Sequence, residues 1–234
     1  MNTKKGLNFW NQKIVYDITR FTTTDYAGHL SCIIWFIGCN FRCLYCYNDS
    51  IVYTKIGKYD FKEVLEFLKI RVEFLDSVVL SGGEATIYNL IPICIEIKKL
   101  GFKIKLDTNG SNFKQIKELV ELKLIDYIAI DFKAPKYRFK EITGSSIYDN
   151  IIKTIQYLIE IDFDFELRTT VNSKLLDEND INSIVKEIVS LGYKKTYYIQ
   201  NFLETFSNIG NIKKGRDLNK SLINSKNLVI QYRN

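Results

Sequence analysis

Histidine, proline and methionine are scarce in this chain. Its 234 residues include one histidine, two prolines and one methionine. A structural zinc site normally uses two pairs of Cys or His ligands, whereas here only Cys43 and Cys46 form such a pair and the one histidine, His29, lies well upstream. The shortage of proline, the absence of a low-complexity tract and a hydrophobic content of 46% indicate a folded chain rather than a disordered one.

Long apolar runs, paired cysteines and linkers are also missing. The longest apolar runs have the length of strands, which argues against a membrane span. Five cysteines are a low and odd number, and no secretory signal opens the sequence, so we expect no disulfide framework. Because no Pro/Gly-rich linker marks a boundary, we predict a single domain over residues 1–234. Its core would cover about residues 24–201, and residues 202–234 would form a C-terminal extension.

The chain carries a net charge of +6 and has a pI of about 8.9. Its basic residues are spread along the predicted helices, and the nearest approach to a cluster is Lys213–Arg216. This distribution indicates a solvated surface, or one that docks an acidic protein or an electron carrier. We therefore expect no nucleic-acid partner and no membrane partner.

Short β-rich runs alternate with helical patterns along most of the chain. Such alternation predicts parallel strands joined by crossover helices, here an α/β fold of the partial (βα)6 TIM-like barrel type. The six predicted strands are Cys32–Ile37, Ser77–Leu80, Lys103–Leu106, Tyr127–Ile130, Phe165–Val171 and Lys195–Ile199. The helical patterns lie around Phe61–Val72, Leu90–Leu100, Phe113–Leu122, Ile151–Leu158 and Ile181–Ile188. After Phe202 the pattern is less regular, and Leu228–Tyr232 could form a last strand.

Three cysteines stand close together directly after the first predicted strand. Cys39, Cys43 and Cys46 have the spacing C-x₃-C-x₂-C. Iron–sulfur clusters are held by cysteine thiolates, usually four, so three thiolates can hold three irons of a 4Fe–4S cube and leave the fourth open. An open position on a metal is a place for chemistry. Cys32 and Cys94 fall in apolar patterns, so we expect them in the core.

Polar and glycine-bearing segments follow the other predicted strands. In a parallel α/β barrel, ligands bind at the carboxyl ends of the strands, so these segments are expected to meet at one rim with the cysteine loop. The segments are Ser81–Glu84, Asp107–Gly110, Asp131–Lys133, Arg168–Thr170 and Gln200–Asn201.

Two of these motifs resemble a known family. The C-x₃-C-x₂-C loop, with the aromatic Tyr45 before its last cysteine, resembles the signature of the radical S-adenosylmethionine (SAM) superfamily. Ser81-Gly82-Gly83-Glu84 resembles the GGE motif of the same family, in which paired glycines let the backbone approach a ligand closely. The resemblance implies a 4Fe–4S cluster on Cys39, Cys43 and Cys46 whose open iron binds the amino and carboxylate groups of SAM. One electron from the cluster then cleaves SAM and releases a 5′-deoxyadenosyl radical.

Longer stretches resemble the activating enzymes of glycyl-radical enzymes, especially the activating proteins of anaerobic ribonucleoside-triphosphate reductase. The stretches are Asp25–Gly28, Gly38–Cys43, Leu106–Gly110, Asp131–Pro135 and Arg168–Val171. This resemblance implies that the chain installs a glycyl radical on a partner enzyme. It also implies a flavodoxin or ferredoxin as the electron donor and a reducing, cytoplasmic setting.

The resemblance implies a set of residues that contact SAM. Asp131 and Arg168 would bind it directly, Asp107 and Thr108 would lie near its ribose or sulfonium end, and a cation between Asp107 and Asp131 is possible. Without the family context, both aspartates could cap turns, Arg168 could pair with one of them, and Glu84 could favour the start of the next helix. The implied cofactor-binding residues are Tyr45, Ser81, Gly82, Gly83, Glu84, Asp107, Thr108, Asn109, Asp131, Lys133 and Arg168.

Two other functions stay open at this point. Many relatives have histidine and proline where this chain has Tyr47 and Ala85, so the substrate is less well defined than the cofactor chemistry. One alternative is a radical SAM enzyme that acts on a small molecule or a peptide. The other is a non-catalytic iron–sulfur or zinc-binding protein that keeps the fold.

Overall fold

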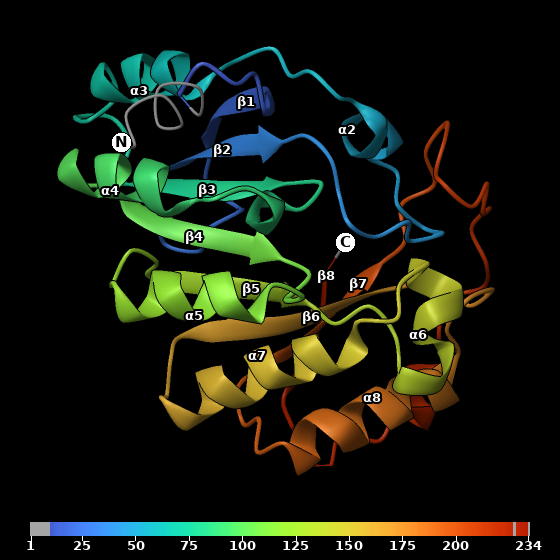
Figure 1. Cartoon of the computed structure of the whole chain (residues 1–234). Helices are drawn as coiled ribbons and strands as arrows, with labels where there is room; N and C mark the ends of the chain where they lie inside the picture. The colour runs from blue at the N-terminus through green and yellow to red at the C-terminus, as the bar shows by residue number, and fades with distance from the viewer. Residues whose placement is uncertain (1–9, 227, 234) are drawn as a thin grey trace. The chain divides into compact units, whose positions relative to one another are not determined.

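The strands form one sheet in which the spatial order follows the order along the chain. In the computed structural model, which describes residues 10–226 and 228–233, eight strands pair in the order β1 to β8. Strand β1 (Val15–Thr22) is antiparallel to β2 (Ser31–Phe36), whereas the pairs β2–β3, β3–β4, β6–β7 and β7–β8 are parallel (Figure 1). The fold is therefore α/β with a mostly parallel, open sheet, as predicted.

Contacts between residues divide the chain into two compact units. Unit 1 comprises residues up to 40, 50–108 and 114–128, and unit 2 comprises residues 41–49, 109–113 and 129–234. The cysteine loop passes from one unit to the other, because Cys39 belongs to unit 1 whereas Cys43 and Cys46 belong to unit 2. The organisation as a single domain stays a prediction.

Unit 1 is built on β1 to β4 and the helices that connect them. Strands β2 and β3 (Ser77–Gly82) carry nearly uninterrupted buried runs, as expected for parallel strands that are covered on both faces. Cys32 and Cys94 are fully buried, so their predicted place in the core is confirmed. The remaining elements are β4 (Lys103–Thr108), α2 (Asp49–Tyr53), α3 (Phe61–Lys69), η1 (Ala85–Ile87), α4 (Ile91–Lys99) and α5 (Phe113–Glu121).

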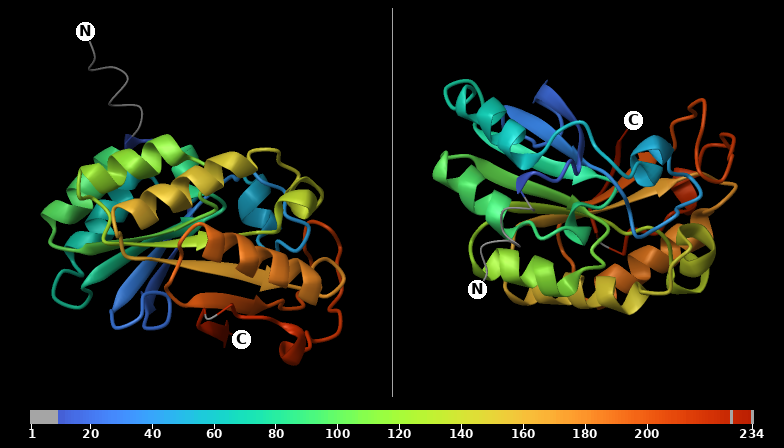
Figure 2. Two further views of the ribbon diagram at one scale, coloured as in Figure 1. Left: turned by 90° about the horizontal axis from the view of Figure 1, so that it is seen from below. Right: turned by 45° about the horizontal axis from the view of Figure 1, so that its top comes forward.

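Unit 2 is built on β6 to β8 with helices alongside. Strand β5 (Tyr127–Asp131) begins in unit 1 and ends in unit 2. Helices α7 (Tyr148–Glu160) and α8 (Glu178–Ser190) lie along β6 (Phe165–Val171) and β7 (Tyr197–Asn201) (Figure 2). Both helices bury isoleucine side chains on one face. The other elements are α6 (Lys136–Thr143), η2 (Lys220–Leu222) and β8 (Ile230–Arg233).

The six predicted strands are confirmed as β2 to β7, with ends that shift by up to two residues. Among the described residues, five elements were not predicted: β1, α2, α6 and the short 3-10 helices η1 and η2. Strand β1 lies at the sheet edge with half-exposed side chains, and α6 buries only Phe139, Ile142 and Thr143, so neither has a strong apolar pattern. The predicted extension of α3 to Val72 is wrong, because the helix ends at Lys69 and Val72 is exposed in the following turn.

The tail after Phe202 returns to the sheet as β8, which pairs with β7 close to the expected position. Among the described residues, no helix has both the length and the apolar character needed to cross a membrane.

Candidate cluster and cofactor site

The amides of the cysteine loop are held by the end of α6. Arg42 N–H donates to the carbonyl of Thr143 at 2.8 Å, and Leu44 N–H donates to the carbonyl of Ile142 at 2.9 Å. The last carbonyls of a helix have no N–H partner within the helix, and here the amides of Arg42 and Leu44 act as those partners. Helix α6, which the sequence did not predict, therefore positions the loop that carries Cys43 and Cys46.

The three thiols of this loop are buried or partly buried. Cys43 is buried and Cys46 is partly buried, and none of the five cysteines forms a disulfide. Burial raises the pKa of Cys43 to about 11, against the opposing effect of the Lys133 ammonium, and burial also raises the pKa of Cys46. Both groups are thiols at neutral pH, so a metal that binds them must displace protons.

Tyr45 places a polar atom in the interior of unit 2. Its side chain is buried, and its hydroxyl finds no hydrogen-bond partner among the described residues. Burial raises the pKa of Tyr45 well above its usual value, so the hydroxyl keeps its proton. Lys133 Nζ lies 5.8 Å from the centre of the Tyr45 ring. An orphaned buried hydroxyl is rare in native proteins and indicates a place where a ligand can bind.

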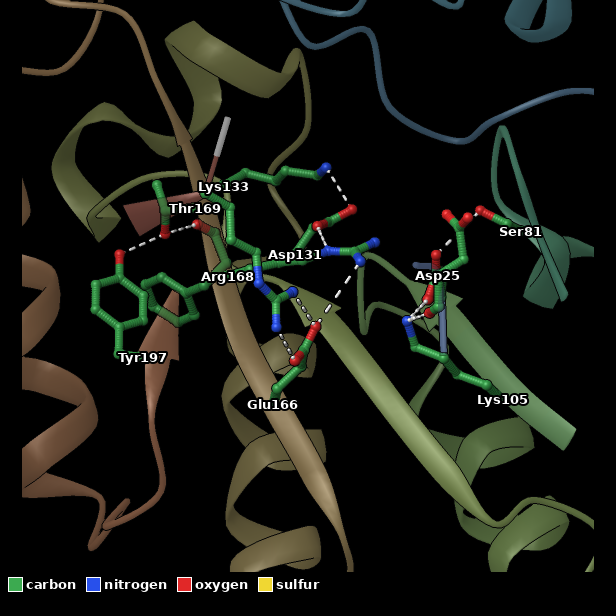
Figure 3. Close-up of polar contacts among 12 residues, drawn as sticks. Asp25, Ser81, Lys105, Asp131, Lys133, Glu166, Arg168, Thr169 and Tyr197 are labelled. Carbon is green, nitrogen blue, oxygen red and sulfur yellow. Dashed lines mark hydrogen bonds and ion pairs between the residues drawn. The ribbon is translucent and has the colours of Figure 1, made fainter. Parts of the chain in front are cut away.

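At the end of β5, the Asp131 carboxylate forms ion pairs with two positively charged side chains of the protein (Figure 3). Arg168 Nε donates to its Oδ1 at 2.5 Å, and Lys133 Nζ donates to its Oδ2 at 2.9 Å. Burial by itself would raise the pKa of Asp131, but the two cations outweigh burial and hold the pKa well below its usual range. The Asp131 carboxylate likewise outweighs the burial of Lys133 and raises the pKa of that ammonium well above its usual value.

The ion pairs continue through unit 2 to the last strand. Glu166 Oε1 lies 4.0 Å from Arg168 Nη1, and both Glu166 oxygens accept hydrogen bonds from Arg233 at 2.9 Å. Arg233 in turn lies over the Tyr198 ring, 3.4 Å from its centre. Asp131, Arg168, Glu166 and Arg233 thus form one chain of alternating charge, which fixes the guanidinium of Arg168 from two sides.

In unit 1 the paired glycines press against the backbone that precedes the first cysteine. Gly82 has a φ of +122°, and a Cβ on Gly83 would lie 1.8 Å from the Gly38 carbonyl oxygen. Gly83 N–H and Glu84 N–H donate to the carbonyls of Phe36 and Gly38, both at 2.9 Å. The close backbone approach expected at this motif is present, with the chain itself as the partner. The predicted contact of Gly82 and Gly83 with a cofactor stays a prediction.

Glu84 has a local structural role. Its Oε1 accepts hydrogen bonds from the Thr86 hydroxyl at 2.6 Å and from the Thr108 hydroxyl at 2.7 Å, and it caps η1. Glu84 thus favours the start of η1, whereas the next helix predicted from the sequence is α4, which begins at Ile91; the predicted contact of Glu84 with a cofactor stays a prediction. Thr108 is buried, and its hydroxyl donates to the Glu84 carboxylate. These two predicted site residues are therefore hydrogen-bonded to each other.

Asp107 belongs to a second polar group of unit 1, of which Ser81 and Lys105 are labelled in Figure 3. Ser81 Oγ donates to its Oδ2 at 3.3 Å, and Lys105 Nζ lies 3.1 Å from its Oδ1. Lys105 is almost fully buried and also donates to the carbonyl of Asp25. Asn109, in unit 2, accepts a hydrogen bond from Ser111 N–H at 3.0 Å and caps a turn. With Asp107 and Asp131 each engaged by protein cations, the cation implied between them gains no support.

Two buried charged residues of these groups were not predicted from the sequence, Lys105 and Glu166. Each stands two positions before a predicted site residue of opposite charge, Asp107 on β4 and Arg168 on β6. Residues two apart lie on the same face of a strand, so a charged pair at this spacing inside an apolar strand is a signal that could have found them.

Comparison with known proteins decides the family. The model of the radical SAM superfamily matches residues 33–188, well over half of the chain. The chain belongs to the radical SAM superfamily. It is 36% identical over 182 residues to a candidate glycyl-radical enzyme activating enzyme of Methanocaldococcus jannaschii, a match that covers 75% of each protein. It is also 29% identical over 147 residues to 7-carboxy-7-deazaguanine synthase of Buchnera aphidicola, which covers 55% of this chain and 63% of that protein.

Solved structures share the fold of this chain. The crystal structure of Streptococcus suis SuiB bound to S-adenosylmethionine superposes with a TM-score of 0.63 at 19% identity. The superposition covers 77% of this chain and 42% of that one. The predicted partial TIM-like barrel is thereby confirmed as the fold class.

The residues of this radical SAM chain fit the cofactors of the family. In the described part of the chain, no three His, Cys, Asp or Glu side chains are grouped as a metal site. The donor set is nevertheless suitable in kind, because three cysteines within eight residues supply the thiolates that an iron–sulfur cluster requires. The orphaned Tyr45 hydroxyl beside Lys133 and the guanidinium of Arg168 offer polar groups to a bound SAM.

Proposed function

We propose that this radical SAM enzyme installs a glycyl radical on a partner enzyme, with anaerobic ribonucleotide reductase as the candidate partner. The observation that carries the proposal is the 36% identity to a candidate glycyl-radical enzyme activating enzyme, over three quarters of both proteins. The stretches of sequence that resemble this branch lie on β4, β5 and β6 as well as in the cysteine loop. The resemblance therefore extends beyond the cofactor motif.

In this proposal, Cys39, Cys43 and Cys46 hold a 4Fe–4S cluster. Bound together, the cluster and SAM would supply the electron transfer and the 5′-deoxyadenosyl radical that abstracts hydrogen from a glycine Cα. A backbone glycine suits this chemistry because its radical delocalises into both flanking amides. The reduced cluster would need a reducing compartment such as the cytoplasm, and the net charge of +6 suits an acidic donor such as flavodoxin or ferredoxin.

The charged chain of unit 2 would bind the carboxylate of SAM. Its five side chains, with Lys133 included, contribute three positive and two negative charges, so one positive charge is in excess. The Arg168 side chain is 13% exposed and presents a planar guanidinium, which recognises carboxylates better than a lysine does. Asp131 and Glu166 would fix the orientation of this guanidinium before the ligand arrives.

The first experiment measures the radical SAM reaction. The protein is reconstituted anaerobically with iron and sulfide and supplied with SAM and dithionite, and 5′-deoxyadenosine is quantified by chromatography. We expect production by the wild type and a loss of at least about 100-fold in Cys43→Ala, because the group that delivers the electron is no longer held. Equal production by the two proteins would exclude the cysteine loop as the site of the cluster.

The second stage tests the partner. The reduced, SAM-loaded protein is mixed with candidate glycyl-radical enzymes, anaerobic ribonucleotide reductase first, and the radical is followed by electron paramagnetic resonance. We expect a carbon-centred signal that disappears when the radical-bearing glycine of the partner is replaced by alanine. Production of 5′-deoxyadenosine without any radical on such partners would contradict glycyl-radical activation.

A small-molecule substrate is the second candidate function. The observation that favours it is the match to a 7-carboxy-7-deazaguanine synthase over 55% of this chain. Consumption of SAM that depends on a metabolite and needs no second protein would support this alternative.

A further inference from the structure

The carbonyls of the cysteine loop are held by the C-terminal extension. Ile209 N–H donates to the carbonyl of Cys46 at 3.0 Å, and Gly210 N–H donates to the carbonyl of Leu44 at 2.7 Å. All of these residues belong to unit 2. Leu44 is therefore bound on both sides, through its amide to α6 and through its carbonyl to Gly210.

The contact is too close for any side chain at position 210. A Cβ on Gly210 would lie 2.8 Å from both the Cβ and the carbonyl oxygen of Leu44, and 3.0 Å from its Cα. These atoms are backbone or adjacent to backbone, so they cannot rotate away as the end of a long side chain could. Gly210 is not in a left-handed conformation, and its role here is the close approach of two chains.

A tight turn presents the two donor amides. The Asn208 side chain donates from Nδ2 to the carbonyl of Ile212 at 2.8 Å and accepts from Ile212 N–H at 2.6 Å. Asn211 N–H donates to the carbonyl of Asn208 at 3.0 Å. One side chain thus closes the turn from residue 208 to residue 212 and orients Ile209 and Gly210 toward the loop.

The extension is fixed again just beyond this turn. Asn172 Nδ2 donates to the carbonyl of Lys213 at 3.1 Å. The Arg216 guanidinium binds both oxygens of Glu178 at 2.6 and 2.7 Å, and Asn219 N–H donates to Glu178 as well. The chain just beyond the turn is therefore attached to the residue that follows β6 and to the first residue of α8, which limits how far the turn can move from the cysteine loop.

We propose that residues 208–212 form a clamp that fixes the Cys43 and Cys46 thiols for iron binding, with Gly210 and Asn208 as positioning residues. The inference rests on the proposed cluster site for its purpose, and it assigns a role to the C-terminal extension. A loop whose amides and carbonyls are both bound keeps the spacing of its ligands without the metal, so less conformational freedom is lost when the metal binds.

Thiol reactivity in the metal-free protein tests the clamp directly. Alkylation of each cysteine by iodoacetamide is followed by peptide mass spectrometry under anaerobic conditions. In Gly210→Val we expect Cys43 and Cys46 to react about 5–30-fold faster than in the wild type, the effect of losing one or two hydrogen bonds. Cys39 serves as an internal control, because it lies outside the segment that the clamp holds, and its rate should change less than about twofold.

Two further variants distinguish loss of the clamp from general unfolding as the cause of faster alkylation. Gly101→Ala introduces a side chain at a φ of +90° with no atom within 4 Å, so it strains the chain away from the loop and should leave the Cys43 and Cys46 rates unchanged. Asn208→Ala opens the turn without a steric clash. If Gly210→Val also exposes the core thiols Cys32 and Cys94, Asn208→Ala decides the outcome. Unchanged Cys43 and Cys46 rates in Asn208→Ala would then overturn the clamp.

The reconstituted protein provides a second measurement. Iron release to a chelator should be about 5–30-fold faster in Gly210→Val than in the wild type, with Gly101→Ala close to the wild type. If Cys43 and Cys46 are alkylated at the same rates, and iron is released at the same rate, in Gly210→Val and the wild type, the clamp is overturned. The proposed cluster site would not be affected by that result. Failure of the wild type to assemble a cluster, with Cys43 and Cys46 still protected, would instead overturn the proposed function and leave the clamp in place.

Discussion

The negative charge of Asp131 balances the positive charges of two largely buried side chains, Arg168 and Lys133. The side chains of Arg168 and Lys133 are 13% and 16% exposed, so neither can rely on water if the carboxylate is removed. We expect Asp131→Asn to lower the free energy of unfolding by about 3 kcal/mol, the usual effect of leaving buried charges without their partner. Urea unfolding of the metal-free protein at pH 7 measures this difference.

Asp149→Asn is the matched control. Asp149 pairs with Lys136 at 2.9 Å, but both side chains are more than two-thirds exposed. Removing an exposed ion pair should change the free energy of unfolding by about 0.5 kcal/mol or less. If the two variants lose the same stability, the Asp131 group does not behave as a buried ion network.

At the level of elements, α8 is tied to the C-terminal extension by its first residue. Glu178 begins the helix and binds Arg216 and the amide of Asn219. The hydrogen bond from Arg216 is the main cause that lowers the pKa of Glu178 to about 2. This places a negative charge at the positive end of the helix, where it also favours helix formation.

This pairing predicts an acid-side loss of stability. A carboxylate whose pKa is lowered by folding stabilises the protein above its unfolded pKa of about 4.3, and this stabilisation is lost as the pH falls toward about 2. Glu178→Gln should therefore be about 1 kcal/mol less stable than the wild type at pH 6, and this difference should shrink below about pH 4.5. Urea unfolding at pH 3 to 6 measures it. Exposed Glu73→Gln is the control, and a gap that is constant with pH would contradict the prediction.

The elements also show how far the sequence could be interpreted. Strands β2 to β7 were predictable because each is a short apolar run between turn signals. Helix α6 was not, although it positions the cysteine loop, because the residues that it buries, Phe139, Ile142 and Thr143, form only a short stripe. What makes α6 important is a pair of backbone carbonyls, and backbone hydrogen bonds leave no trace in side-chain patterns.

At the scale of the whole molecule, two buried thiols are expected to lower the stability of the fold at alkaline pH. Burial raises the pKa of both Cys32 and Cys94 to about 12. A group whose pKa is raised by folding stabilises the protein below its unfolded pKa, about 8.5 for cysteine, and this stabilisation is lost as the pH rises toward the folded value. Each thiol should lower the free energy of unfolding by about 1.4 kcal/mol per pH unit above about pH 9.

The double variant Cys32→Ala/Cys94→Ala tests this expectation. It should be less stable than the wild type at pH 7, because two small cavities form, but its stability should fall less steeply between pH 9 and 11. Urea unfolding with a reductant present gives both slopes. Parallel slopes would show that other groups cause the alkaline loss.

The candidate site was predictable in its residue types and less so in its contacts. The cysteine spacing and the polar strand ends pointed to Cys39, Cys43, Cys46, Asp131 and Arg168 from the sequence. Glu166 was missed although its position two residues before Arg168 is visible in the sequence. Arg233 and Gly210 were not found, because their roles depend on partners 65 or more residues away or on a single missing Cβ. Such long-range pairings follow from the sheet order and the path of the tail, which local patterns do not specify.

The clamp also has a consequence for the order of events during synthesis. Gly210 follows Cys46 by 164 residues, which at typical translation speeds corresponds to roughly 10–30 s. During that interval the nascent chain carries Cys43 and Cys46, the proposed iron ligands, before the segment proposed to hold them has been made. If these thiols bind iron as proposed, iron delivery and thiol oxidation compete for the two side chains until the segment around Gly210 emerges from the ribosome.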